Sequence, residues 1–207
     1  MDDELVFRMA FWVLFVILLV IRVTAMVRLR LAGQAVLPDS QAIRQEGRGL
    51  FALRLASWFL MVGWMGCYAI YPAWMVYLQI DLQPWIRWFG FILGLGSLAL
   101  LAWTQAALGT QFSPQLRLQE GHHLVTSGPY GRVRHPMYSS MFGLGAAFAL
   151  VTANWVFVAL AVAVIAGLLV RARREEEMML AEFGEEYRQY MRRTGRYFPK
   201  TGVETPA

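Results

Sequence analysis

The alternation of apolar and polar segments along the chain predicts a set of long helices. Three apolar stretches in the first half cover residues 5–26, 50–71 and 85–108. A helix rises about 1.5 Å per residue, so each stretch is long enough to cross a hydrocarbon core of about 30 Å. We therefore expect residues 1–108 to form three transmembrane helices, with a basic loop over residues 28–50.

A further apolar stretch, residues 137–170, is too long for one span and suits a tight helical hairpin. Its polar break is Thr152-Ala153-Asn154, where we place the turn. Residues 171–199 follow with an amphipathic pattern, which predicts a helix lying against the bundle or the lipid surface. The expected fold is all-α: an integral membrane bundle of five transmembrane helices with a cytoplasmic C-terminal amphipathic helix.

Composition agrees with a membrane location. Hydrophobic residues make up 57% of the chain and charged residues 16%, whereas soluble domains average roughly 45–50% and 25%. The high hydrophobicity excludes an intrinsically disordered chain, and the single cysteine excludes a fold stapled by internal disulfides. In a multi-pass membrane protein, basic residues concentrate in the cytoplasmic loops. We therefore interpret the net charge of +5 as an indication of membrane orientation and expect no nucleic-acid partner.

The placement of arginines predicts the orientation of the chain. Basic residues follow the first apolar stretch, precede the hairpin and follow it, whereas the opposite side carries Arg87 beside Asp81. The positive-inside rule then puts the N-terminus outside and the C-terminus in the cytoplasm. An odd number of spans requires termini on opposite sides, which agrees with five.

The unusual polar residues gather in two stretches on the predicted cytoplasmic side. Residues 109–140 contain all three histidines, and residues 170–199 contain three consecutive glutamates. His122 and His123 are adjacent and point apart on any regular element. Because zinc needs three or four convergent ligands, we predict no metal site. If the helix continues past residue 170, Arg171 and Glu175 share one face.

These two stretches resemble a known family. The motifs are His122-x-Leu-Val-Thr-Ser-Gly-x-Tyr130, Arg134-His135-Pro136-x-Tyr138, Arg171-x-x-x-Glu175-Glu-Glu, Phe183-Gly-x-x-Tyr187-x-x-Tyr190 and a closing Phe198-Pro199. Their order and spacing resemble the isoprenylcysteine carboxyl methyltransferase family and, more loosely, the membrane phospholipid methyltransferases. The resemblance covers residues 108–199, which is under half of the chain.

The resemblance implies a membrane enzyme that transfers a methyl group from S-adenosylmethionine and releases S-adenosylhomocysteine. Its catalytic region would be residues 109–207, with a cofactor loop at 109–136. The positions that match the family's cofactor contacts are Gln115, His122, His123, Leu124, Val125, Tyr130, His135, Pro136, Met137, Tyr138 and Glu175. Arg171 matches the family's substrate-side arginine, and Arg171, Glu175 and His135 are the candidate catalytic residues.

The chemistry of these side chains suits that reaction. A carboxylate such as Glu175 can accept charge-assisted hydrogen bonds from the cofactor's amino group or ribose hydroxyls. The faces of Tyr130 and Tyr138 suit a cationic sulfonium. Arg171 can orient a carboxylate acceptor, which needs no general base, whereas an amine acceptor must lose a proton to His135 or a glutamate. The sequence leaves both acceptors open.

The expected partners are membrane lipids and a lipid-bearing or prenylated acceptor, either a small molecule or a peptide. Two alternatives remain. One is a phospholipid amine methyltransferase. The other is an NADPH-dependent enzyme similar to sterol reductases, which share the Arg-His-Pro-x-Tyr element. That reductase pattern favours Asn after the proline and Gly-Asp after the tyrosine, whereas this chain has Met137 and Ser139-Ser140.

Overall fold

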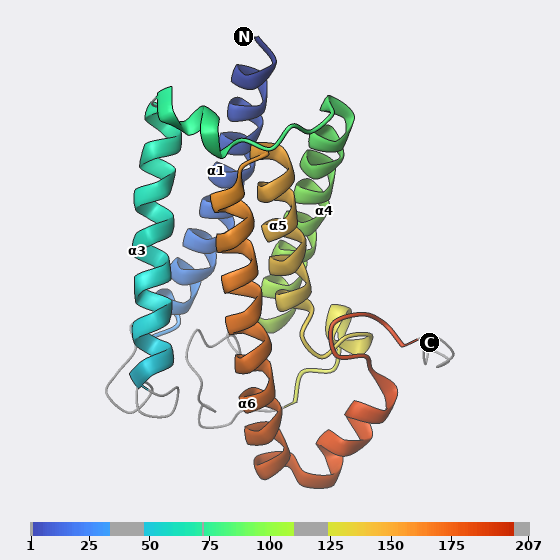
Figure 1. Cartoon of the computed structure of the whole chain (residues 1–207). Helices are drawn as coiled ribbons and strands as arrows, with labels where there is room; N and C mark the ends of the chain where they lie inside the picture. Colours follow the sequence, from blue (N-terminus) through green and yellow to red (C-terminus); the bar gives the residue numbers. More distant parts are fainter. Residues whose placement is uncertain (1, 34–47, 72, 110–123, 201–207) are drawn as a thin grey trace.

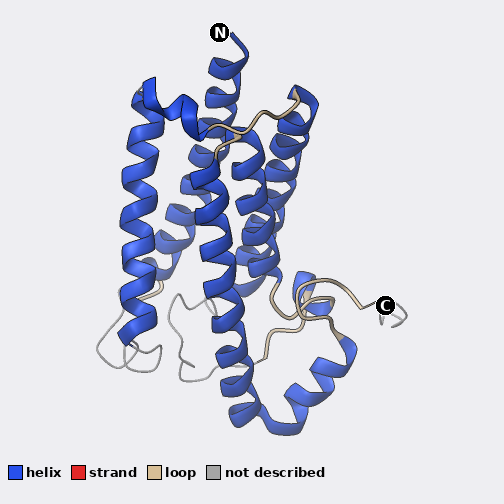
Figure 2. Ribbon diagram, in the orientation of Figure 1, coloured by secondary structure: helices blue, strands red, loops and turns tan. Residues whose placement is uncertain are grey.

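The computed structural model of the protein describes residues 2–33, 48–71, 73–109 and 124–200. Within these ranges the regular elements are helical, as predicted (Figure 2). The long helices are α1 (Asp2–Leu31), α3 (Arg48–Ile70), α4 (Pro84–Leu108), α5 (Pro136–Thr152) and α6 (Trp155–Arg193). Two 3₁₀ turns, η1 (Ala73–Leu78) and η3 (Gly128–Gly131), lie in the connections.

The long helices lie side by side in an elongated bundle (Figure 1). The start of α1, the start of α4 and the turn around Ala153 are at one end, which we call the hairpin end. The start of α5 and the part of α6 that carries Glu175 are at the other, which we call the charged end.

Three of the helices in the described ranges, α1, α4 and α6, are long and apolar enough to cross a membrane. Two shorter apolar helices, Phe59–Ile70 and Pro136–Thr152, accompany them. Many large apolar side chains point outward, among them Ile92 and Val162, and such a surface suits lipid. In the described residues the fold is an all-α bundle with helices that suit a membrane, while the count of five spans and the cytoplasmic location of the charged end stay predictions.

The turn between α5 and α6 confirms the interpretation of the polar break. Helix α5 ends at Thr152, and Ala153 takes a left-handed conformation with φ of 45°. The Asn154 side chain accepts a hydrogen bond of 3.0 Å from the N–H of Val156 and caps α6. A polar cap thus reverses the chain within a few residues.

Helices α4 and α5 pack most closely, and glycines allow it. A Cβ added at Gly90 would lie 2.6 Å from the Cβ of Leu150, and one added at Gly143 would clash with Ser97. A Cβ added at Gly94 would lie 2.6 Å from a methyl of Leu14 on α1. These glycines serve packing, as expected for small residues in lipid.

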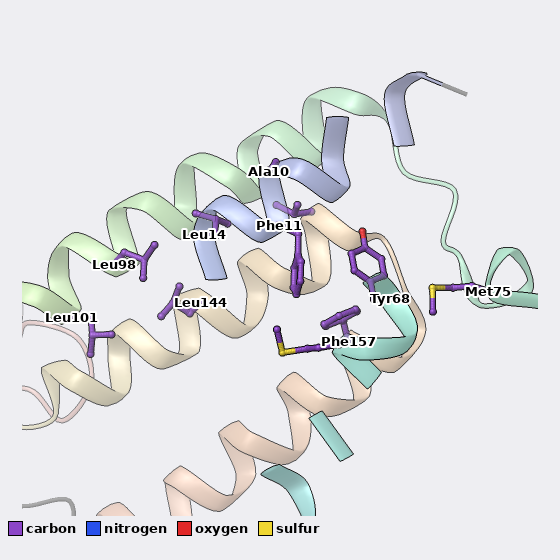
Figure 3. Packing of buried hydrophobic residues seen from close by; sticks show 11 residues of the cluster. Ala10, Phe11, Leu14, Tyr68, Met75, Leu98, Leu101, Leu144 and Phe157 are labelled. Atoms are coloured by element: carbon purple, nitrogen blue, oxygen red, sulfur yellow. The ribbon is translucent and has the colours of Figure 1, made fainter. Parts of the chain in front are cut away.

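The core is centred on Phe11 of α1 (Figure 3). Its ring centroid lies 5.0 Å from that of Tyr68 on α3 and 5.2 Å from that of Phe157 on α6. Leu98 and Leu144 extend the same cluster along α4 and α5. The cluster therefore joins all five long helices.

Arg87 ties the hairpin end together. It is 8% exposed and donates hydrogen bonds of 3.0 and 2.8 Å to the carbonyl of Val151. A third hydrogen bond of 2.8 Å reaches the carboxylate of Glu4. Although Asp81 is close in sequence, the carboxylate that pairs with Arg87 comes from α1, so one arginine joins α1, α4 and α5.

Helix α6 is one long element that carries two kinds of sequence. Its first part, residues 155–170, is apolar, and its continuation from Arg171 is charged. Gly184 is non-helical, with φ of 49° and ψ of −116°, and breaks the helix. Past this break the chain folds back toward the start of α5 (Figure 1). This return brings the C-terminal segment to the charged end.

Candidate active site

Two backbone segments far apart in the sequence pair at the charged end. Residues 132–135 run beside residues 194–196 and form an isolated parallel bridge. Three N–H···O bonds of 2.9, 3.0 and 3.1 Å hold them, from Arg134 to Gly195, from His135 to Arg196 and from Gly195 to Arg132. Pro136 then opens α5 in the first turn, where its missing N–H needs no partner. The bridge therefore positions His135 immediately before α5.

Glu175 is the centre of a cluster drawn from both polar stretches. The hydroxyl of Tyr138 donates a hydrogen bond of 2.6 Å to its Oε1 atom, and the Nε of Arg171 donates one of 3.0 Å to the same atom. The Oε2 atom lies 3.6 Å from Nδ1 of His135. The ring of His135 stacks on Tyr138 with centroids 5.3 Å apart and an angle of 5°. We call these four residues the Glu175 cluster.

Glu176, the next residue, lies in a more buried site. Its side chain is 7% exposed. Its Oε1 accepts a hydrogen bond of 3.0 Å from Nε of Arg134 and lies 3.2 Å from Nε2 of His135, while Oε2 accepts from Arg196. Burial alone would raise the pKa of Glu176, but the hydrogen bonds from His135, Arg196 and Arg134 lower it to about 2. Glu176 is therefore ionised at neutral pH.

His135 connects the two carboxylates. Its Nδ1 faces Glu175 and its Nε2 faces Glu176, and its side chain is 9% exposed. An imidazole can carry a proton on either nitrogen. Because each nitrogen of His135 has a carboxylate nearby, the ring is placed to hold a proton on the side of Glu175 or on the side of Glu176.

Buried tyrosines hold together the segments around the Glu175 cluster. The hydroxyl of Tyr190 donates a hydrogen bond of 2.7 Å to the carbonyl of Tyr130 in η3, so the end of α6 is fixed to the loop before α5. Burial raises the pKa of Tyr130, Tyr187 and Tyr190. These hydroxyls therefore stay protonated at neutral pH, and that of Tyr190 acts as a hydrogen-bond donor.

The structure brings together four of the predicted site residues: His135, Tyr138, Arg171 and Glu175. The shared face predicted for Arg171 and Glu175 is confirmed, because α6 continues through both residues.

The other predicted site residues lie around that cluster or outside the description. Tyr130 is buried in η3, and Pro136 is buried in the first turn of α5. Met137 packs against the apolar core. Leu124 and Val125 are half-buried in the segment before η3. Gln115, His122 and His123 lie outside the described residues.

Glu176 and Arg196 were not among the residues that the sequence singled out for a role. Glu176 forms part of the glutamate run, but nothing in that run marks which carboxylate is buried. Helix geometry could have indicated that the two carboxylates differ. Neighbouring residues on a helix point about 100° apart, so Glu175 and Glu176 must face different surroundings. Arg196 belongs to residues 194–196, which we call the C-terminal strap. The return of this strap to the start of α5 depends on the break at Gly184.

Comparison with known proteins shows what the chain resembles. Residues 85–186 match the model of a family described as phospholipid methyltransferase. The matched range holds α4, α5 and the part of α6 that carries the Glu175 cluster. The chain thus resembles membrane methyltransferases, and the similarity inferred from its motifs is confirmed.

Among solved structures, the chain is similar to one of the eukaryotic intramembrane Ras methyltransferase ICMT, an isoprenylcysteine carboxyl methyltransferase. The identity is 20% and the TM-score is 0.48. The similarity covers 83% of this chain and 56% of that one, so the chain spans little more than half of its length. The curated proteins gave no match.

Proposed function

We propose that the protein transfers a methyl group from S-adenosylmethionine to a lipid-linked acceptor. The observation that carries this proposal is the convergence of His135, Tyr138 and Arg171 on Glu175. These residues come from two separate polar stretches, and all of them lie within the range that matches the methyltransferase family. The apolar outer surface of the bundle supports an acceptor that reaches the site from the bilayer.

The Glu175 cluster fits the cofactor chemically. The cofactor supplies a methyl group on a cationic sulfur and carries an amino group and ribose hydroxyls. Oε1 of Glu175 already accepts two hydrogen bonds, whereas Oε2 lies 3.6 Å from His135, beyond hydrogen-bond distance. We assign to Oε2 the charge-assisted hydrogen bond with the amino group or a ribose hydroxyl.

The remaining cofactor contacts belong to the same proposal. Backbone groups of Leu124 and Val125 would bind the adenine edge, and the aromatic faces of Tyr130 and Tyr138 would lie toward the cationic sulfur. Pro136 and Met137 would complete the wall at the start of α5. Gln115, His122 and His123 are assigned to the cofactor by the resemblance alone.

For the acceptor, we favour a carboxylate such as that of a prenylated cysteine. Arg171 binds Glu175 through Nε, and a guanidinium has five donors in a planar fork that matches a carboxylate. An acceptor carboxylate would compete with Glu175 for Arg171 and be oriented by it. Such a carboxylate is ionised at neutral pH, so the transfer needs positioning and no general base.

The description of the matching family, phospholipid methyltransferase, supports a phospholipid as a second candidate acceptor, and its amine would then be the group that receives the methyl. An amine must lose a proton to become nucleophilic. His135 is placed to take it, because each of its ring nitrogens faces a carboxylate. The two acceptors therefore differ in whether His135 transfers a proton.

Calorimetric titration of the detergent-purified protein with S-adenosylhomocysteine tests the reaction class, with NADPH run in parallel. We expect micromolar binding of S-adenosylhomocysteine and none of NADPH. Binding of NADPH alone would move the protein to the reductases and overturn the roles given to Arg171 and Glu175.

The same titration tests Glu175 itself. Glu175→Gln is expected to weaken binding of S-adenosylhomocysteine by about 1.5–3 kcal/mol, which is the usual contribution of a hydrogen bond to a charged group. Glu177→Gln removes the same charge from an exposed position two residues away and is expected to change nothing. Equal affinity for both variants and the wild type would remove Glu175 from the cofactor site.

A further inference from the structure

A cavity of about 420 Å³ lies between α1 and α4, near the charged end. Its walls are mostly apolar, with Val20 and Ile21 on one helix and Ala102 and Ala106 on the other. The residues of the Glu175 cluster do not line it. Its volume falls within the range of small-molecule sites, roughly 300–1,000 Å³.

The sequence explains why the space exists. Midway along the bundle, Gly94 lets Leu14 of α1 pack directly onto α4. About two to three turns farther along α4, the side chains that line the cavity include the short ones of Ala102 and Ala106. Small residues that allow contact in one half of the helix pair leave a gap in the other.

Two uncharged polar side chains line the cavity, one from each helix. Thr24 and Gln105 line the cavity, and Gln105 is 9% exposed. With its amide oriented so that both atoms are satisfied, Gln105 donates to the carbonyl of Ile21 at 3.3 Å and accepts from Arg22 at 3.2 Å. Gln105 thus joins α1 and α4 through hydrogen bonds at the inner wall of the cavity.

Arg28 gives the cavity a positive rim. It lines the cavity, is exposed and belongs to the last turn of α1 together with Arg30. Arg30 stands in the same turn but is not part of the lining. An apolar slot with a cation at its mouth, at the end of a membrane helix, matches an amphiphile with an anionic headgroup.

We propose that this cavity binds one membrane phospholipid with an anionic headgroup, such as phosphatidylglycerol. The phosphate lies against Arg28, the glycerol region faces Thr24 and Gln105, and the first part of an acyl chain packs on Val20 and Ile21. Charge complementarity at Arg28 and the apolar walls select this occupant. The site is separate from the Glu175 cluster, so it does not depend on methyl transfer.

Native mass spectrometry of the full chain, released from detergent with added phosphatidylglycerol or phosphatidylcholine, tests the proposal. We expect the wild type to retain phosphatidylglycerol in preference to phosphatidylcholine. Arg28→Gln should lower the affinity for phosphatidylglycerol about tenfold. The matched variant Arg30→Gln, which removes the same charge in the same turn, should lower it less than about threefold. Equal losses in the two variants would indicate general surface attraction and overturn the site.

A second pair of variants tests whether the lipid occupies the volume of this cavity. Ala106→Phe fills the cavity and should abolish retention of phosphatidylglycerol, whereas Ala99→Phe places the same side chain at an exposed position of α4 outside the lining and should preserve it. Far-UV circular dichroism of each variant confirms that the helices are intact. Retention by a folded Ala106→Phe variant, or equal retention of the two lipids by the wild type, would overturn the proposal.

Discussion

At the residue scale, two neighbouring glutamates on α6 have different surroundings. The side chain of Glu175 is 25% exposed and that of Glu176 is 7% exposed. Glu175 shares a hydrogen bond with a tyrosine and an arginine, whereas Glu176 lies among Arg134, Arg196 and His135. We interpret Glu176 as the residue that holds the charged end together and Glu175 as the one that meets ligands.

Glu176→Gln is therefore expected to destabilise the protein by about 3 kcal/mol, because removing one member of a buried ion pair leaves the other charges uncompensated. Thermal unfolding in detergent measures the change. Glu177→Gln is the control, since Glu177 is exposed. Unfolding temperatures that agree for the two variants would contradict the structural role of Glu176.

The same carboxylate predicts a pH dependence. Its pKa is about 2 in the folded protein, against a usual value of 4.5. A lowered pKa stabilises the folded state fully above the usual value, and the contribution disappears as the pH falls through the folded value. We expect the difference in unfolding temperature between the wild type and Glu176→Gln to be constant above about pH 5 and to shrink toward pH 2. A difference that grows on acidification would contradict the assignment.

Most of these side-chain contacts could not be predicted from the sequence. The pairing of Arg171 with Glu175 could be predicted, because residues four apart on a helix are neighbours. The pairs of Arg134 with Glu176 and of Arg87 with Glu4 join residues that are 42 and 83 positions apart. Such pairs depend on how helices pack, and one sequence contains no local signal for them.

At the element scale, the closeness of α4 and α5 depends on single glycines. Gly90→Ala should destabilise the bundle by about 1–3 kcal/mol, because the added methyl meets the Cβ of Leu150, which cannot rotate away. Gly96→Ala on the same helix adds its methyl in open space and should be neutral or stabilise the helix by up to about 1 kcal/mol. Chemical unfolding in mixed micelles compares the two, and a larger loss at position 96 would contradict the packing.

The helices themselves were predictable. Apolar runs and their polar breaks indicated α1, α3 and α4 within a few residues, and Asn154 marked the hairpin turn. The sequence does not indicate the direction in which the chain leaves the break at Gly184. That direction is set by tertiary contacts, such as the hydrogen bond from Tyr190 to the carbonyl of Tyr130.

At the scale of the whole molecule, the two ends of the bundle have different chemistry. The hairpin end holds Arg87 and Glu4, and the charged end holds the Glu175 cluster. The orientation predicted by the arginines would place the charged end in the cytoplasm.

Cysteine labelling tests this orientation. In a Cys67→Ser background, Tyr77→Cys lies in the exposed connection η1 and should react with an impermeant maleimide in intact cells. Glu186→Cys lies past Gly184 and should react only after the membrane is permeabilised. The opposite pattern would invert the topology, and labelling of both positions in intact cells would contradict an odd number of spans between them.

The strap formed by residues 194–196 has a consequence for biosynthesis. Residues 132–135 emerge from the ribosome long before Gly195 and Arg196, yet the N–H groups of Arg134 and His135 and the carbonyl of Arg132 find their backbone partners in those two residues. The apolar helices can enter the bilayer one after another during translation. The charged end, in contrast, is completed only when residues 194–196 have emerged and fold back. A nascent chain would thus be membrane-inserted before it is able to act, and its site would mature after insertion.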